Sequence, residues 1–106
     1  MPQANPLDRV FGAMSDSTRR GMLRRLAGGP MTIGELGRPY DISKPTVSHH
    51  VRVLQTAGLI KVTKRSRERI CTLRAAPMRQ AQRWLDFYAD FWSGSFDRLA
   101  ERARKR

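Results

Sequence analysis

The most informative part of this sequence is Ser43-Lys-Pro-Thr-Val-Ser-His-His-Val-Arg-Val-Leu-Gln-Thr-Ala-Gly-Leu-Ile60. Ser43 is a preferred helix N-cap, and Pro45 lies in the first turn, where a missing backbone N–H costs little. Gly58 is well placed to end the helix. Four residues share one side at helical spacing and should pack on other helices, namely Val47, His50, Val51 and Leu54. The stretch therefore predicts a short helix with a polar outer face.

Downstream of Gly58 the pattern changes to period two. Residues 59–64 and 69–73 are rich in β-branched side chains, and residues 65–68 join them. This arrangement predicts a hairpin. Pro77 then opens a long final helix that should run to about residue 103.

Three more helices are expected upstream. Residues 7–14 carry an apolar stripe at helical spacing. Ser15 or Asp16 can cap a second helix, which residues 28–30 (Gly-Gly-Pro) end. Thr32 and Glu35 form a capping box for a short third helix, and residues 38–42 form a turn. The fold class expected is mainly α with a small β-hairpin: a winged helix-turn-helix of five helices, with the hairpin between the fourth and fifth.

Composition limits the partners. The chain has 106 residues with 21 Lys+Arg against 9 Asp+Glu, a net charge of +12, and a pI near 11.5. One modest domain over residues 1–106 is expected, with residues 7–76 as core and wing. The positive field favours polyanions. No secretory signal, no apolar run of membrane-spanning length and a single cysteine together predict a cytoplasmic protein without a disulfide.

The outer side of the fourth helix and the hairpin suit double-stranded DNA. Cations and hydroxyls on the helix can read base edges in a major groove, and cations on the hairpin suit phosphates or a minor groove. A solvated helix face and edge-strand protection are the structural alternatives. The predicted DNA-binding residues are Lys44, Thr46, Ser48, His49, Arg52, Lys64, Arg65, Arg67 and Arg69.

The last predicted helix concentrates the aromatic residues. Its broad apolar stripe exceeds what a small monomer can bury, which favours a twofold homodimer. A core helix in a monomer is the weaker alternative. Acidic residues on the polar side disfavour a membrane-surface helix. The predicted interface residues on this helix are Trp84, Tyr88, Phe91, Trp92 and Phe96.

Catalytic and metal-binding patterns are missing from the sequence. His49 and His50 are adjacent, which is not the i, i+4 spacing of a metal pair, and His50 is on the apolar side. No nucleophile–base pair can be located. Cys71 is expected to be a packed thiol. We therefore predict no cofactor, no metal site and no enzymatic activity.

Several motifs resemble the ArsR family of winged-helix repressors. They are Asp16-Ser-Thr-Arg-Arg20, Thr32-Ile-Gly-Glu-Leu36, Ser43-Lys-Pro-Thr-Val-Ser-His-His50 and Leu54-Gln-Thr-Ala-Gly-Leu59. The resemblance implies a homodimer that binds a twofold-symmetric operator and blocks transcription. It also implies that the first and last helices build the dimer, which adds Leu7, Val10 and Phe11 to the expected interface and makes residues 77–105 a dimerisation helix.

One departure from the family pattern matters. Metal-sensing members have a Cys-x-Cys pair where this chain has Gly37, Arg38 and Pro39, and no histidine follows His50. Arsenic or zinc sensing is therefore not expected, and the effector is unknown. A sequence-nonspecific nucleoid binder and a protein-interaction adaptor that uses the aromatic helix are the alternative functions.

Overall fold

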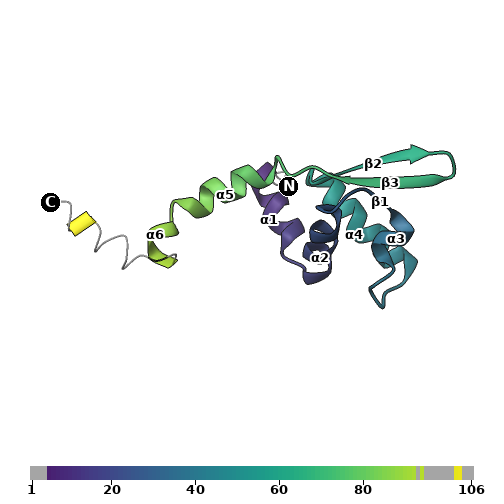
Figure 1. Cartoon of the computed structure of the whole chain (residues 1–106), viewed down its shortest axis with the longest axis horizontal. Helices are drawn as coiled ribbons and strands as arrows, with labels where there is room; N and C mark the ends of the chain where they lie inside the picture. Colours follow the sequence, from purple (N-terminus) through teal and green to yellow (C-terminus); the bar gives the residue numbers. More distant parts are fainter. Residues whose placement is uncertain (1–4, 93, 95–101, 104–106) are drawn as a thin grey trace.

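The computed structural model describes residues 5–92, 94 and 102–103 (Figure 1). The order of elements is α1 (Pro6–Met14), α2 (Ser17–Leu26), β1 (Met31–Thr32), α3 (Ile33–Gly37), α4 (Lys44–Thr56), β2 (Ile60–Arg65), β3 (Glu68–Leu73), α5 (Met78–Asp86) and α6 (Ala89–Trp92). The expected class, a mainly helical winged helix-turn-helix, is confirmed.

Side-chain caps start the helices where the sequence places them. Thr32 Oγ1 accepts from the Glu35 amide, and the Glu35 carboxylate accepts from the Thr32 amide, both at 3.0 Å, which completes the predicted capping box. Ser43 Oγ accepts from an amide in the first turn of α4 at 3.2 Å. Asp16 caps α2, so the choice between Ser15 and Asp16 is settled. Each such cap stabilises its helix by about 1 kcal/mol.

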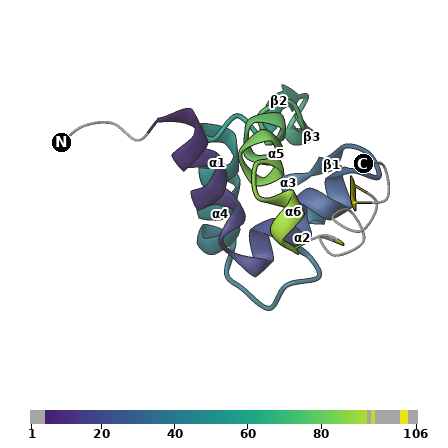
Figure 2. The same ribbon diagram turned by 90° about the vertical axis from the view of Figure 1, so that its left-hand side faces the viewer.

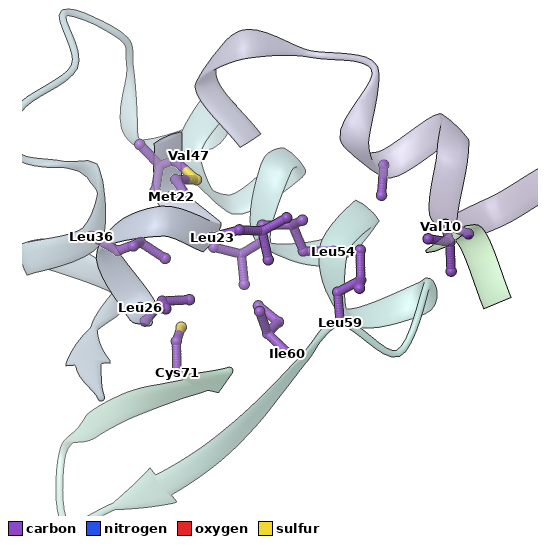
Figure 3. Packing of buried hydrophobic residues seen from close by; sticks show 13 residues of the cluster. Val10, Met22, Leu23, Leu26, Leu36, Val47, Leu54, Leu59, Ile60 and Cys71 are labelled. Carbon is purple, nitrogen blue, oxygen red and sulfur yellow. The ribbon is translucent and has the colours of Figure 1, made fainter. Parts of the chain in front are cut away.

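The core lies where α2, α3 and α4 meet the inner face of the sheet (Figure 3). Leu54 of α4 is fully buried, and burial of a leucine side chain stabilises a fold by about 1.5–3 kcal/mol. The buried side of α4 is the one predicted, and His50 is the polar member of it. Because that side packs inward, the opposite side of α4 faces outward. The core residues are Val10, Ala13, Met22, Leu23, Leu26, Leu36, Val47, Val51, Leu54, Leu59, Ile60, Cys71 and Ala81.

The sheet has one more strand than predicted. β2 pairs antiparallel with β3 from Ile60 opposite Leu73 to Arg65 opposite Glu68, which is the expected hairpin. β1 pairs with the other edge of β3 and gives the order β1-β3-β2. The sequence prediction missed β1 because two residues carry no periodicity, and because Thr32 reads as a helix cap.

A tight turn closes the hairpin at Ser66 and Arg67. Ser66 has φ of 60°, and it is the non-glycine residue with positive φ among those described. Positive φ at the first central position alone is the pattern of a type II′ turn, whose twist matches that of the flanking strands. The wing therefore projects as a straight, narrow ribbon (Figure 1).

The prediction of a single long last helix was wrong in one respect. α5 ends at Asp86, and the amides of Tyr88 and Phe91 bond carbonyls three residues back, at 2.9 Å each, before and within α6. The described chain thus has six helices, not five. Phe87, at this break, is 77% exposed, and an exposed aromatic residue is a modest helix former, so burial adds little to helix stability there. Most residues after 92 lie outside the described part.

α5 packs on α1 at its start (Figure 2). It then leads away from the body, so that α6 lies far from the wing (Figure 1). Within the described residues, no helix combines the length and the apolar character that crossing a membrane requires.

Candidate nucleic-acid interface

Close packing fixes α4 against α3. A Cβ added at Gly37 would lie 2.6 Å from Cγ2 of Val47, so only glycine lets the two helices approach this closely. On the other side of α3, the Arg25 guanidinium donates to the carbonyls of Leu36 at 2.6 Å and Glu35 at 2.9 Å. These contacts supply donors to carbonyls at the end of α3 and tie α2 to α3.

The outward side of α4 carries a polar stripe. Lys44, Ser48 and Arg52 recur every four residues and all three are exposed. Since four residues turn a helix by slightly more than 360°, these side chains form one row along the helix. Gln55 continues the row at its far end and is also exposed.

The row faces the wing across a small cavity of about 110 Å³. Ser48, Arg52 and Gln55 line it from α4, and Arg69 lines it from β3. Helix and wing therefore present one concave surface with hydroxyl, amide and guanidinium groups. Such groups can donate to base edges and phosphates. Sequence reasoning missed Gln55, although its spacing from Arg52 could have indicated it.

A larger cavity of about 520 Å³ lies at the start of α4, toward α3. Lys44 and Ser48 line it together with Arg38 of the turn. Arg38 was not predicted as a site residue. Its basic side chain, a few residues before α4, could have indicated it. The basic surface thus extends from the wing, along α4, to the turn after α3.

The wing carries like charges opposite one another. Lys64 pairs in register with Arg69, and Arg65 pairs with Glu68, while Arg67 occupies the turn. Lys64 and Arg69 lie on the same face as the inward-facing Val62, at the outer end of that face. Like charges directly opposite each other destabilise a ladder, so this pair has no structural benefit. A polyanion against the wing would relieve the repulsion.

The structure does not gather every predicted residue in one place. Thr46 is exposed, but its Oγ1 lies 2.8 Å from Ser43 Oγ, within the cap of α4. His49 is exposed on the side of α4 that faces α1, away from the wing. Arg65 and Arg67 are at the distal end of the hairpin (Figure 1). Ser48, Arg52 and Arg69 are the predicted residues that the fold brings together.

Four of the predicted interface residues, Phe11, Trp84, Tyr88 and Phe91, form a continuous aromatic strip. Phe11 of α1 meets Trp84 of α5 edge to face with ring centroids 5.7 Å apart, Trp84 meets Tyr88 at 5.0 Å, and Tyr88 meets Phe91 at 6.4 Å. Phe91 and Trp92 are 79% and 63% exposed.

The remaining predicted interface residues differ in placement. Leu7 is partly buried against the core, and Val10 is fully buried inside the protomer, so its side chain has no surface left to offer a partner. Phe96 lies outside the described residues.

Titratable side chains form no centre of another kind. In the part of the chain that the structure describes, no three His, Cys, Asp or Glu side chains come together as metal ligands would. Cys71 is fully buried beneath the sheet, and burial raises the pKa of its thiol. A protonated, inaccessible thiol is a poor nucleophile and a poor metal ligand.

Comparison with known proteins agrees with this geometry. Residues 14–63 match a family model described as a helix-turn-helix domain. The transcriptional repressor SdpR of Bacillus subtilis is 34% identical over 79 residues, which cover 74% of this chain and 88% of SdpR. The HTH-type transcriptional regulator Rv2034 of Mycobacterium tuberculosis is 49% identical over 53 residues, half of either protein. A solved structure described as the ArsR family transcriptional regulator RHA00566 matches with a TM-score of 0.76 and 34% identity, over 83% of this chain and 97% of that one.

Proposed function

The chain belongs to the ArsR family of winged helix-turn-helix transcriptional regulators, and from that premise we propose that it is a homodimeric repressor that binds a twofold-symmetric operator. The observation that carries the proposal is the surface shared by Ser48, Arg52 and Arg69, which joins α4 to the wing. The name of SdpR supports repression as the mode of action.

We assign α4 to the major groove. Lys44, Ser48 and Arg52 form the row nearest the DNA, with Thr46 and His49 on the far flank of the helix. Arginine is the side chain best suited to bidentate recognition of guanine, and each good pair discriminates by about 1–3 kcal/mol. The wing residues Lys64, Arg65, Arg67 and Arg69 would hold phosphates or the adjacent minor groove.

The aromatic strip supports the homodimer. Phe11, Trp84, Tyr88 and Phe91 contact one another in series, and the last three are exposed in the single protomer, whereas Phe11 is partly buried. Pairing of two such strips about a twofold axis would bury them and set the two α4 helices on half-sites about one helical turn (~34 Å) apart. Residues 77–105 would then serve as the dimerisation segment of a single winged domain.

Fluorescence anisotropy tests the proposal on the DNA upstream of the chain's own gene. A scrambled duplex serves as competitor across a salt series. We expect binding that exceeds the scrambled duplex by a factor of about 10³ or more. Equal affinity for both duplexes would favour a nucleoid-type binder, and no binding to either would favour an adaptor.

Arg52→Ala is the decisive variant. We expect it to weaken operator binding roughly 10- to 100-fold, because it removes a base or phosphate contact from each half-site. Its control is Arg24→Ala, which removes the same charge from an exposed position on α2 outside the cavities of the α4 surface. Unchanged affinity in a folded Arg52→Ala dimer would remove Arg52 from the interface.

A further inference from the structure

A second hollow lies on the other side of α4, between that helix and α1. Its volume is about 380 Å³. Its floor is small and apolar and consists of Gly12, Ala13, Val53 and Ala57. Its rim is polar and consists of Arg9, His49, Arg52 and Thr56. We refer to it as the α1–α4 hollow.

Small residues keep the hollow open. A Cβ added at Gly12 would meet no atom within 4 Å, so the space beside this glycine is free. Glycine within a helix costs about 0.5–1 kcal/mol relative to alanine, and Gly12 is inside α1. The local fold does not require it, because Gly12 is not among the glycines with positive φ.

The rim carries positive charge without a partner of opposite sign. No acidic side chain of the residues that the structure describes lines the hollow. Among the described residues, the guanidinium groups of Arg9 and Arg52 have no carboxylate within ion-pair distance. Asp8 precedes Arg9 in the chain, but its side chain is exposed and is not part of the lining. An anionic group at the rim would therefore meet two free guanidinium groups and the Thr56 hydroxyl.

We propose that the α1–α4 hollow binds a small organic acid, a monocarboxylate with an apolar body, and that the bound acid releases the protein from DNA. Guanidinium pairs with carboxylate through two parallel hydrogen bonds. The apolar floor would cover the body of the acid, and the volume lies in the usual range for small-molecule sites. A DNA phosphate would use the rim but gain nothing from the floor.

Arg52 couples the hollow to DNA. It lines both the α1–α4 hollow and the cavity between α4 and the wing. A carboxylate that engages Arg52 would withdraw it from the surface that faces DNA, and His49 lies on the same rim. The release of DNA rests on the proposed function above, whereas the binding of the acid does not.

Isothermal titration calorimetry with 1-naphthoate tests the site without DNA. Neutral 1-naphthamide and inorganic phosphate serve as reference ligands. We expect naphthoate to bind and both references to bind at least about tenfold more weakly, since each lacks either the charge or the apolar body. Equal affinity for naphthamide would overturn the role of the rim, and equal affinity for phosphate would overturn the role of the floor.

Variants at two positions, Gly12 and Arg9, locate the bound acid. Gly12→Leu should fill the hollow and abolish binding, and Gly12→Ala should weaken it while making the helix more stable. Arg9→Gln should weaken binding about tenfold by removing one charge-assisted contact, whereas Arg24→Gln on α2 should not. Full affinity in the stable Gly12→Ala variant together with Arg9→Gln would place the acid elsewhere and overturn the proposal.

Anisotropy with operator DNA then tests the coupling. Saturating naphthoate should raise the Kd for DNA about tenfold or more in the natural chain and leave it unchanged in Gly12→Leu. An unchanged Kd for DNA in the natural chain at saturating naphthoate would overturn the coupling. A chain that binds naphthoate in calorimetry but binds no DNA would refute the proposed function and leave the acid site standing.

Discussion

Arg19 joins three elements through one guanidinium group. Its Nε donates to the Ala13 carbonyl at 2.8 Å and its Nη2 donates to the Gly12 carbonyl at 3.2 Å, at the end of α1. Its Nη1 lies 3.0 Å from Nδ1 of His50 in α4. Arginine can only donate, so Nδ1 must accept and the ring proton sits on Nε2. The family motif around Asp16 thus has a structural purpose here: it ties α1 to the recognition helix.

Asp16 adds a pH-dependent contribution to stability. A hydrogen bond from the Arg19 amide, at 3.0 Å, lowers the pKa of this carboxyl more than burial raises it, and the nearby Arg19 charge lowers it further. A carboxyl whose pKa falls on folding stabilises the native state above its unfolded pKa of about 3.9. That stability is lost as pH falls through the lower folded value.

Asp16→Ala should therefore reduce the free energy of unfolding by about 1 kcal/mol near pH 6, and by progressively less below about pH 4. Urea unfolding followed by circular dichroism across this range measures the difference. The capping contacts with Thr32 also lower the pKa of Glu35. Because Glu35 is present in both proteins, its contribution cancels in the difference. A difference that stays constant down to pH 2.5 would contradict the assignment.

Gly37→Ala should destabilise the fold by about 1–3 kcal/mol, because the new methyl group would meet both methyl groups of Val47. Gly34→Ala is a matched control on the same helix, where a Cβ would meet only Thr32 Oγ1 at 3.9 Å. Thermal unfolding compares the two. Similar melting temperatures would show that α3 and α4 can separate without cost.

At the scale of elements, the wing carries charges that lower the stability of the hairpin and favour binding of a polyanion. Lys64 and Arg69 face each other in register one pair before the end of the ladder, where repulsion weakens the hairpin. The same two side chains extend the basic face of the ribbon. A residue choice that harms the isolated element while it favours a polyanionic partner is typical of a functional site.

Lys64→Gln should separate these two effects. We expect the free energy of unfolding to rise by a few tenths of a kcal/mol, about 0.2–0.5, as the repulsion disappears. We also expect weaker operator binding and a salt dependence whose logarithmic slope falls by roughly one per protomer. Lys61→Gln is the control, because Lys61 faces Thr72 and not a cation. If Lys64→Gln lowered both the free energy of unfolding and the affinity for DNA, the claim that this charge lowers stability while it favours binding would be wrong.

At the scale of the whole molecule, α5 packs on α1 at its start, and the aromatic side chains farther along α5 and in α6 are exposed. Their aromatic strip begins on α1 at Phe11 and continues along a helix that leaves the body (Figure 1). Contiguous exposed apolar surface of this kind marks an interface. Phe91 contributes least to the protomer and most to such an interface, since it is 79% exposed.

Phe91→Gln should raise the dissociation constant of the dimer at least tenfold, because an aromatic anchor typically contributes about 2 kcal/mol or more to binding. The dimer would lose two such anchors, one from each protomer. Sedimentation equilibrium would show a shift from twice 12.1 kDa toward 12.1 kDa at low micromolar concentration. Phe91→Leu keeps an apolar side chain and should preserve most of the dimer. An unshifted Phe91→Gln protein would exclude this residue from the interface.

Local signals in the sequence were sufficient for most elements. Thr32 and Ser43 cap helices through their own side chains, and the buried side of α4 follows from spacing alone, since these interactions span three or four residues. The exposed cations of α4 and the wing were likewise evident from composition. The break at Phe87 and Tyr88 was not evident, because it depends on how far the fold buries those side chains.

The sequence on its own determined the order of the helices and the hairpin, and it determined which side of α4 packs into the core. Tertiary structure alone decided which distant residues meet: β1 with β3, Arg19 with His50, Arg69 with Arg52 and Gln55, and Arg9 with Arg52 across the α1–α4 hollow. The physical reason is range. Caps and helical stripes form between near neighbours, whereas these contacts depend on how whole elements pack, and no periodicity of one element records the position of another.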